Sequence, residues 1–279
     1  MPFSNLIHAH SVSLRGIHWL VMILACALLA GCNSVPGSGR NQLNRYSIEQ
    51  EIRMGSDAYD QMVEDVTVLE DGPEVEMIDR VTRRIAASAE RLHPGVADDF
   101  DWEVVVIDDD SVANAWALPG GKMAVYTGLL PYTKNEDGLA VVMGHEAAHA
   151  IARHGGENMT RAAMVGLIAV GASVTMDDDA QPYIGATAAA YGLLGEPAFS
   201  RVQESEADEL GLMISAAAGY DPREAIKLWE RMAADSDGPP EFLSTHPSEN
   251  TRIEKLQAVM PQAMALYREA LAGQNASSE

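Results

Sequence analysis

The amino-acid sequence predicts an α+β fold, a mainly helical domain with a small antiparallel sheet beside one apolar helix. Three observations support this class. Apolar residues recur at helical spacing over residues 75–92, up to Pro94. A β-branched stretch at 102–107 is typical of a strand, and Pro119–Gly121 is typical of the turn of a hairpin. An apolar run at 139–144 then opens a long region of helical patterns.

The elements before the apolar run follow one another along the chain. A first helix is expected to contain Ile52, Ala58 and Met62, and the stripe described above forms a second helix. Two extended stretches, 112–118 and 122–127, flank the turn. We expect them to pair as an antiparallel hairpin, because the turn between them is short and rich in glycine.

The apolar run belongs to a helix that we expect to begin after Asn135, because an asparagine side chain accepts the free N–H groups at a helix start. Glu136 and Asp137 in the first turn suit the positive end of the helix dipole. The helix is predicted to continue to about His154 and to stop at Gly155–Gly156.

More helices are expected in the second half of the chain. The short apolar stretches 162–174 and 183–194 are predicted as packed core helices or as a lid, in preference to membrane insertion, because each is too short to span a bilayer. Further helices are expected at 200–218 with Gly219 just beyond it, after Asp221–Pro222, and at 248–272 with an interruption at Pro261.

The first 31 residues resemble an export signal. Arg15 is the only charged residue before Cys32, and a short apolar run from Trp19 to Leu29 follows it. The ending Leu-Ala-Gly-Cys resembles the bacterial lipobox. The resemblance implies cleavage before Cys32 and lipid attachment to Cys32, and an ordinary signal peptide that contains a cysteine is the alternative.

These features divide the chain into four parts. We predict a lipoprotein signal peptide at 1–31 and a lipidated Cys32 on a flexible tether at 32–47. One folded domain follows at 48–272, and residues 273–279 are predicted to be a disordered tail.

Composition limits the partners of the chain. A formal net charge of −22 argues against nucleic-acid binding, which needs a basic surface. The same charge repels anionic lipid head groups, so we expect the lipid anchor to be the only link to a membrane. Of the two cysteines, Cys26 lies in the signal and Cys32 is the lipidation site, so no disulfide is expected.

The pattern His145-Glu146-Ala-Ala-His149 lies inside the apolar helix. Two histidines at i and i+4 lie one turn apart on one helix face, so both imidazoles can reach one metal ion. Glu146 can then take a proton from the attacking water. The pattern predicts a zinc hydrolase with one Zn²⁺ per chain, and a pair of packed core histidines is the alternative.

A catalytic zinc usually takes three protein ligands, so a third candidate is needed. His154 lies ~140° around a continued helix from His149 and is predicted to be a surface residue at the helix end. Glu204 and Asp208 share a helix face, and one carboxylate can bind metal while the other orients a ligating histidine. Glu206 lies ~200° from Glu204 and is predicted to be a solvated carboxylate.

Several ordered motifs carry a family resemblance over most of the chain. They lie at 39–43, 114–121, 127–130, 145–149, 200–208, 218–222 and 244–247. In these motifs the chain is similar to the peptidase family that contains HtpX and the CAAX prenyl proteases, in its soluble bacterial lipoprotein branch (LoiP-like and BepA-like). The resemblance implies a gluzincin-type metalloprotease domain.

The resemblance also implies a role for individual residues. His246 lies in a Ser-Thr-His-Pro loop, and by the resemblance it is a fourth ligand that acts as a self-inhibiting switch, or a donor to the oxyanion. A surface histidine before a helix is the alternative reading. The other roles carry over as zinc ligands for His145, His149 and Glu204, the catalytic base for Glu146, and the hydrogen-bond partner of a ligating histidine for Asp208.

The predicted reaction is hydrolysis of peptide bonds, with zinc polarising the scissile carbonyl. We expect the peptide to lie as an added strand beside Asn114, Ala115, Trp116, Ala117 and Leu118. The resemblance implies substrates among unfolded or misassembled periplasmic and outer-membrane proteins, with envelope assembly machinery or a partner protease as further partners. It places the chain on the outer membrane, facing the periplasm. A zinc-containing periplasmic chaperone or assembly factor with little proteolysis is the alternative, and a structural lipoprotein without zinc is a second.

Overall fold

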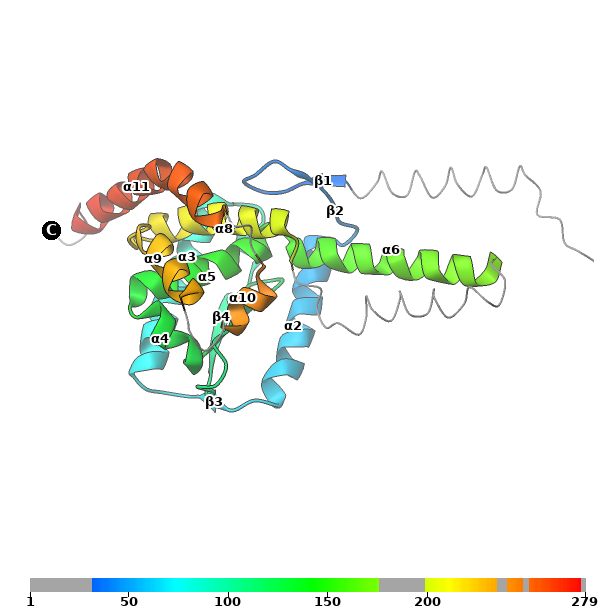
Figure 1. Cartoon of the computed structure of the whole chain (residues 1–279), viewed down its shortest axis with the longest axis horizontal. Helices are drawn as coiled ribbons and strands as arrows, with labels where there is room; N and C mark the ends of the chain where they lie inside the picture. The colour runs from blue at the N-terminus through cyan, green and yellow to red at the C-terminus, as the bar shows by residue number, and fades with distance from the viewer. Residues whose placement is uncertain (1–31, 176–198, 235–239, 248–250, 277–279) are drawn as a thin grey trace, which may run out of the picture.

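The computed structural model describes residues 32–175, 199–234, 240–247 and 251–276 (Figure 1). Helices pack on one another and on a small sheet, so the predicted α+β class is confirmed. The expected signal at 1–31 and the apolar stretch at 183–194 lie outside the described residues. Within the described ranges, none of the helices combines the length and the apolar composition that crossing a bilayer requires.

Helix α5 (Glu136–Ile151) forms the centre of the domain, and every residue from Gly138 to Ile151 is buried. It begins as predicted, because the Asn135 side chain accepts a hydrogen bond from the Gly138 N–H at 2.9 Å. Helices α3 (Pro73–Leu92) and α8 (Arg201–Ala217) and strand β5 (Ala115–Leu118) pack around it. A helix that is apolar on all sides is stable only when it is enclosed in this way.

The sheet has the order β3-β4-β6-β5, with β3 at Val68–Leu69, β4 at Glu103–Ile107 and β6 at Lys122–Tyr126. The predicted hairpin is confirmed, because β5 and β6 pair antiparallel on either side of the Pro119–Gly121 turn. Strands β4 and β6 pair in parallel, which makes the sheet mixed. Strand β5 therefore lies at an edge of the sheet, next to α5.

Helices α5 and α8 approach each other unusually closely at two glycines. A Cβ atom added at Gly211 would lie 2.7 Å from the His145 Cα, and one added at Gly144 would lie 2.6 Å from the Gly211 carbonyl oxygen. Helix α8 begins at a capping box in which Ser200 and Gln203 bond each other's backbone N–H. The close contact brings the acidic face of α8 to the histidines of α5.

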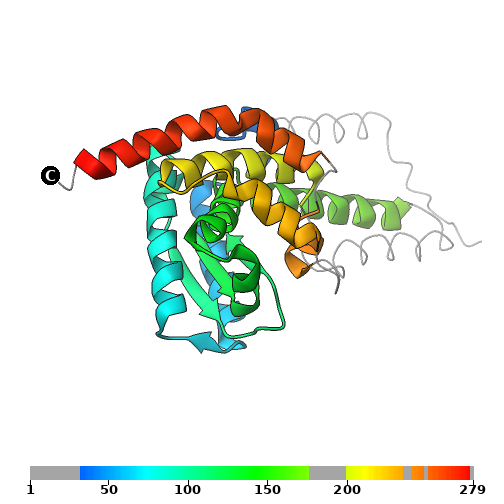
Figure 2. The same ribbon diagram turned by 60° about the vertical axis from the view of Figure 1, so that its left-hand side comes forward.

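The remaining elements frame this pair. Helix α11 (Arg252–Ala276) lies along α8 on the outside of the domain (Figure 2). The others are α2 (Ile48–Glu64), α4 (Leu130–Thr133), α6 (His154–Thr175), α9 (Glu224–Ala233), α10 (Glu241–Thr245) and the 3₁₀ turns η1 (Ala97–Asp99) and η2 (Thr127–Leu129).

Several predicted boundaries in the second half hold and others do not. The helix at 200–218 is confirmed, and Gly219 beyond it has a φ of 83°. The interruption predicted at Pro261 is wrong, because α11 continues through this residue to Ala276. Residues 273–276 of the predicted tail are therefore helical, held as the end of a long helix that packs on α8.

The predicted end of the motif helix is also wrong. Helix α5 stops at Ile151, and α6 begins at His154 and runs through both glycines. Arg153 between them has a φ of 60°, a left-handed conformation that side chains rarely adopt. Tertiary contacts hold it there, because Arg153 donates to Glu51 at 2.8 Å and to the Tyr46 carbonyl at 2.6 Å.

The flexible tether predicted at 32–47 is wrong for most of its length. Strands β1 (Cys32–Ser34) and β2 (Asn41–Leu43) pair as an antiparallel hairpin, which we call the amino-terminal hairpin (residues 32–44). Val35 is 1% exposed and belongs to the hydrophobic core, and Gln42 and Asn44 are also buried. Glycine- and serine-rich composition suggested a linker, but the buried contacts of this segment offset the conformational entropy that it loses on folding.

Candidate metal centre and active site

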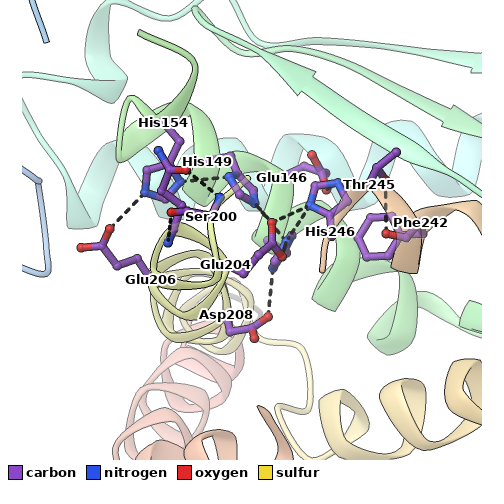
Figure 3. A network of polar contacts seen from close by, with 12 residues as sticks. Glu146, His149, His154, Ser200, Glu204, Glu206, Asp208, Phe242, Thr245 and His246 are labelled. Carbon is purple, nitrogen blue, oxygen red and sulfur yellow. Dashed lines mark hydrogen bonds and ion pairs between the residues drawn. The ribbon is translucent and has the colours of Figure 1, made fainter. Parts of the chain in front are cut away.

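Four side chains from three parts of the chain converge in the interior of the domain. Figure 3 labels three of them, His149, Glu204 and His246. His145 and His149 come from α5, Glu204 from α8, and His246 from the residue after α10. Each offers one ligand atom, and these atoms all lie within 4.8 Å of one another. All four residues are buried. The structure therefore brings together the three predicted ligands and the predicted switch residue.

The separations of the ligand atoms have the size that one tetrahedral cation requires. His145 Nε2 lies 3.1 Å from His149 Nε2 and 3.3 Å from His246 Nδ1. Glu204 Oε1 lies 3.2 Å from His246 Nδ1, and Glu204 Oε2 lies 3.4 Å from His145 Nε2. The corners of a tetrahedron are ~3.4 Å apart when each is ~2.1 Å from its centre, the usual length of a bond to zinc.

The outer nitrogens of the two helix histidines explain why lone pairs face the centre. His145 Nδ1 lies 3.1 Å from Asp208 Oδ1, which can only accept when it is ionised. His149 Nδ1 lies 2.9 Å from His154 Nδ1. With protons on both outer nitrogens, the inner nitrogens can offer their lone pairs to a cation, and a proton on His145 Nε2 that bonds Glu204 stands in the place of that cation. Such a group of converging lone pairs and a carboxylate is stable around a cation, so the donor set fits a metal ion.

The surroundings shift the ligands in opposite directions. Burial alone would raise the pKa of Glu204, but hydrogen bonds from His145, His149 and His246 hold that pKa far below its usual range. Burial lowers the pKa of His145, yet hydrogen bonds to Asp208 and Glu204 outweigh it and raise that pKa to about 9. Burial lowers the pKa of His149 well below its usual value. A metal ion would take the place of the proton on His145.

Glu146 lies beside the centre without being one of its ligands. Burial raises the pKa of its carboxyl group, while His246, His145 and a backbone hydrogen bond from Ala117 lower it in part. Its Oε1 atom is buried and has no hydrogen-bond partner among the described residues. His246 Nε2 lies 3.4 Å away from this atom. One oxygen of this carboxylate beside the ligand cluster can therefore still accept a proton, as a general base requires.

His154 and Glu206 do not lie where the sequence placed them. His154 is fully buried, not at the surface, because the chain reverses at Arg153 and returns the ring to His149. Glu206 does face away from the ligand cluster, yet it is 8% exposed and covered by the amino-terminal hairpin. Burial alone would raise the pKa of Glu206, but hydrogen bonds from His154, Ser38 and Arg40 lower it to about 2.

The sequence analysis missed Arg252, the first residue of α11. Its Nε donates to Asp208 Oδ2 at 2.6 Å and its Nη2 donates to Glu204 Oε2 at 3.0 Å. The guanidinium lies 3.7 Å from the centre of the Trp229 ring. It holds both carboxylates of α8 in place. Nothing in a single sequence pairs an arginine with acids more than forty positions earlier.

Aromatic rings fix the histidines from the side. Phe199 stacks on His149 with ring centres 3.8 Å apart, and Phe242 stacks on His246 at 4.5 Å. The backbone of α10 is tied to the chain just before β5, because the Phe242 N–H donates to the Ala113 carbonyl at 3.1 Å. The expected substrate segment, Asn114–Leu118, therefore runs alongside the centre, with Ala117 bonded to Glu146.

Comparisons with known proteins agree with this site. The sequence matches peptidase family M48 over residues 74–260. Mitochondrial metalloendopeptidase OMA1 of Schizosaccharomyces pombe is 39% identical over 235 residues, which cover 82% of this chain and 66% of the relative. Metalloendopeptidase OMA1 of Homo sapiens is 33% identical over 186 residues, 62% of this chain and 35% of the relative. The beta-barrel assembly-enhancing protease of Escherichia coli is 27% identical over 240 residues, 82% of this chain and 48% of the relative.

The chain spans less than two thirds of the length of each of these relatives. The mitochondrial relatives were not expected from the motifs, which pointed to a bacterial branch of the family. The matched region includes all four residues of the ligand cluster and Glu146. The geometry of the metal centre and the match over residues 74–260 together lead to one conclusion: the chain belongs to peptidase family M48.

Proposed function

We propose that this chain is a zinc-dependent endopeptidase that hydrolyses peptide bonds in unfolded or misassembled proteins of the bacterial envelope. One observation carries the reaction type: the buried Glu146 carboxylate lies beside four converging ligand atoms and keeps Oε1 without a partner among the described residues. A site that only stores a metal has no use for a buried carboxylate oxygen that lacks a hydrogen-bond partner, which costs stability.

Each residue of the centre has a defined part in this reaction. Zinc, when bound by His145, His149 and Glu204, supplies Lewis-acid chemistry to the scissile carbonyl and to the attacking water. Glu146 accepts the proton of the water and delivers it to the leaving amine. The raised pKa of Glu146 suits both steps, because a base with a pKa nearer to neutrality also serves as an acid. Asp208 keeps the His145 ring in the tautomer that offers Nε2.

Strand β5 is the proposed binding edge for the substrate. Within the described part of the sheet it pairs with β6 on one side only. On its other edge the N–H groups of Ala115 and Ala117 bond the Asn114 side chain and Glu146, and an added substrate strand would replace these bonds. Ala117, in the middle of β5, is bonded to Glu146, which places this edge at the reacting groups. Such binding reads backbone more than side chains, and it therefore favours unfolded segments as substrates.

An apolar pocket of about 190 Å³ opens at the end of β5. It lies between α2, α6 and the turn after β5. Phe199 is one of its lining residues, and the ring of Phe199 stacks on His149, so the pocket lies next to the metal centre. We propose that it takes one large apolar side chain of the bound peptide. The lining residues are Met54, Gly55, Ala58, Leu118, Pro119, Gly155, Asn158, Met159, Ala162 and Phe199.

His246 is proposed to keep the enzyme closed at rest. Its Nδ1 lies within ligand distance of the other donors, so four protein ligands would fill a tetrahedral site and leave no position for water. The loop that carries it would then have to move before substrate is cut. In its present position His246 Nε2 lies 3.4 Å from Glu146 Oε1, so a small shift of the ring would leave it near the reacting groups as a donor to an oxyanion.

The proposed location and partners are supported by the Cys32 motif and by the relatives. The Leu-Ala-Gly-Cys32 sequence supports a lipid anchor on the outer membrane, facing the periplasm. The name of the Escherichia coli relative supports a role near β-barrel assembly, and envelope assembly machinery or a partner protease are the proposed partners. The mitochondrial relative OMA1 is named a metalloendopeptidase, which supports the proposed reaction type but not the proposed location. The net charge of −22 argues against a nucleic-acid partner.

A zinc-containing chaperone with little proteolysis is the second candidate function. It would use the same edge strand and apolar pocket to hold extended chains. The geometry of Glu146 favours the peptidase, because a pure binding protein needs no proton acceptor at the metal centre.

Digestion of an unfolded protein decides between these candidates. The zinc-loaded full chain and its Glu146→Gln variant are incubated with casein and with an unfolded porin, and the products are identified by mass spectrometry. We expect cleavage by the wild type and a rate ~10²–10⁴-fold lower in the variant, with zinc content unchanged. If neither the zinc-loaded wild type nor the zinc-loaded His246→Ala variant cuts either protein, the result would contradict the peptidase and favour the chaperone.

A further inference from the structure

A second polar network leads from the ligand His149 away from the metal centre (Figure 3). His149 Nδ1 lies 2.9 Å from His154 Nδ1, and His154 Nε2 lies 3.2 Å from Glu206 Oε2. We call His149, His154, Glu206 and the hairpin residues that bind Glu206 the His149 network. His154 is 0% and Glu206 8% exposed, so the network is buried from His149 to Glu206 and reaches the surface only at the hairpin.

The positions of the protons follow from the chemistry of the ends. His149 offers its Nε2 lone pair to the centre, so its proton is on Nδ1 and is donated to His154 Nδ1. His154 then carries its own proton on Nε2 and donates it to Glu206. Only this arrangement satisfies every nitrogen, and it fixes both the tautomer and the orientation of the His149 ring.

The amino-terminal hairpin closes the network. The Ser38 hydroxyl donates to Glu206 Oε1, and Arg40 Nε donates to Glu206 Oε2 at 2.7 Å. The two terminal nitrogens of Arg40 donate to Glu157 at 3.0 and 2.7 Å. The guanidinium is thus fully used as a bridge between two buried carboxylates, a geometry that lysine does not reproduce.

The other helix ligand has a matching support. His145 bonds Asp208, and Asp208 accepts from Arg252 at 2.6 Å. Each histidine of α5 is therefore supported by a carboxylate that an arginine holds, directly for His145 and through His154 for His149. One arginine comes from helix α11 near the end of the described chain, and the other comes from the hairpin at its beginning.

We propose that His154 and Glu206 are positioning residues for the ligand His149, and that Ser38 and Arg40 make the amino-terminal hairpin part of that support. The inference rests on the proposed zinc site. It has a consequence for the segment after Cys32: displacement of the hairpin would remove two donors from Glu206 and loosen one metal ligand. The segment that leads to the expected anchor then acts on the metal centre.

The test measures metal binding, without any use of cleavage. The dissociation constant for Zn²⁺ is determined for the full chain by competition with a chromogenic chelator, and the Co²⁺-substituted protein is examined by its visible absorption spectrum. We expect Glu206→Gln and His154→Ala to raise the dissociation constant about 10–100-fold and to change the Co²⁺ spectrum. Arg40→Ala should act in the same direction.

Two further variants separate positioning from general stability. His154→Asn should recover part of the affinity lost in His154→Ala, because the amide oxygen of asparagine can accept the His149 Nδ1 proton. Arg84→Ala is the matched control for Arg40→Ala, because Arg84 donates to the Ala218 and Gly219 carbonyls at the far end of α8. It should lower the melting temperature and leave the Zn²⁺ dissociation constant unchanged.

An unchanged dissociation constant and an unchanged Co²⁺ spectrum in Glu206→Gln would overturn the inference, even if the melting temperature falls. Glu206→Gln is nearly isosteric, so it decides the question if His154→Ala does not fold. The two proposals fail in different ways. Wild type that holds no stoichiometric zinc contradicts the proposed function, whereas zinc-loaded wild type with unaltered variants contradicts only the role of the His149 network.

Discussion

At the scale of single residues, three of the four proposed metal ligands are held in place by a second side chain that bonds them. Both histidines of α5 are oriented by a bond to the outer nitrogen, and Glu204 is held by Arg252. His246 differs, because it lies on the short segment after α10 and Phe242 stacks against it. Of the four proposed ligands, His246 is therefore the one best placed to leave the centre.

Substitution of His246 tests the closed state. We expect His246→Ala to raise basal cleavage of casein, because water can then take the fourth position. If His246 is in place in about nine molecules of ten, the increase is about tenfold. Ser244→Ala is the matched control, since Ser244 is exposed and bonds only the Glu241 carbonyl of the same helix in the described contacts. A fall in rate with zinc retained would assign His246 to the oxyanion instead.

At the scale of elements, the distance between α5 and α8 decides whether Glu204 reaches the histidines. Gly211 sets that distance, because an added Cβ would lie 2.7 Å from the backbone of Gly144 and His145. We expect Gly211→Ala to lower the free energy of unfolding by about 1–3 kcal/mol in urea denaturation, since two helix backbones must separate. Zinc affinity should fall with it.

A glycine in open space provides the control for this substitution. Gly166 lies in α6 with no atom within 4 Å of an added Cβ. Gly166→Ala should leave stability unchanged or raise it by up to ~1 kcal/mol, because alanine favours the helix. Equal effects of the two substitutions would show that the close contact at Gly211 has no special cost.

The pocket at the end of β5 belongs to the same scale, because three elements and Phe199 form it. Filling it with Ala162→Phe should reduce kcat/KM at least about tenfold for sites with a large apolar residue, and leave sites with small residues unchanged. The measurement is the cleavage-site profile of a casein digest. Leu271→Phe, at an exposed position on α11, is the control. An unaltered profile would remove the pocket from the substrate site.

At the scale of the whole molecule, the metal centre joins distant parts of the chain. Its ligands and supports come from the amino-terminal hairpin, α5, α8, the segment after α10 and α11. Four metal-ligand atoms that lie this close together repel one another unless a cation or a proton lies between them. Binding of the metal should therefore stabilise the fold as a whole.

Removal of the metal should therefore lower the melting temperature of the full chain. An ion bound only by the native state contributes about 4 kcal/mol when its free concentration is about 1,000 times its dissociation constant. We expect dialysis against a chelator to lower the melting temperature in calorimetry, and added Zn²⁺ to restore it. Equal melting temperatures with and without bound zinc, verified by metal analysis, would show that the fold does not depend on the centre.

Local patterns in the sequence were sufficient for much of this protein. Helical periodicity predicted α3, the capping residue Asn135 predicted the start of α5, and a helix was expected at 200–218, where α8 lies. The His-Glu-x-x-His spacing placed two ligands and a base on one helix face, and the paired acids one turn apart supplied Glu204 and Asp208. These features depend on neighbours within one or two turns, which the sequence records directly.

Other features depend on contacts between segments that are far apart in the sequence, so they became apparent only from the folded structure. The left-handed Arg153 turned His154 inward, because Glu51 and the Tyr46 carbonyl hold its side chain. The segment predicted as a tether is ordered because buried Val35 and the bonds to Glu206 compensate its chain entropy. Local spacing in the sequence thus identified the residues of one helix face that can bind a metal ion and accept a proton. Which polar residues are buried behind these ligands depends on how distant segments pack, and local patterns do not record that packing.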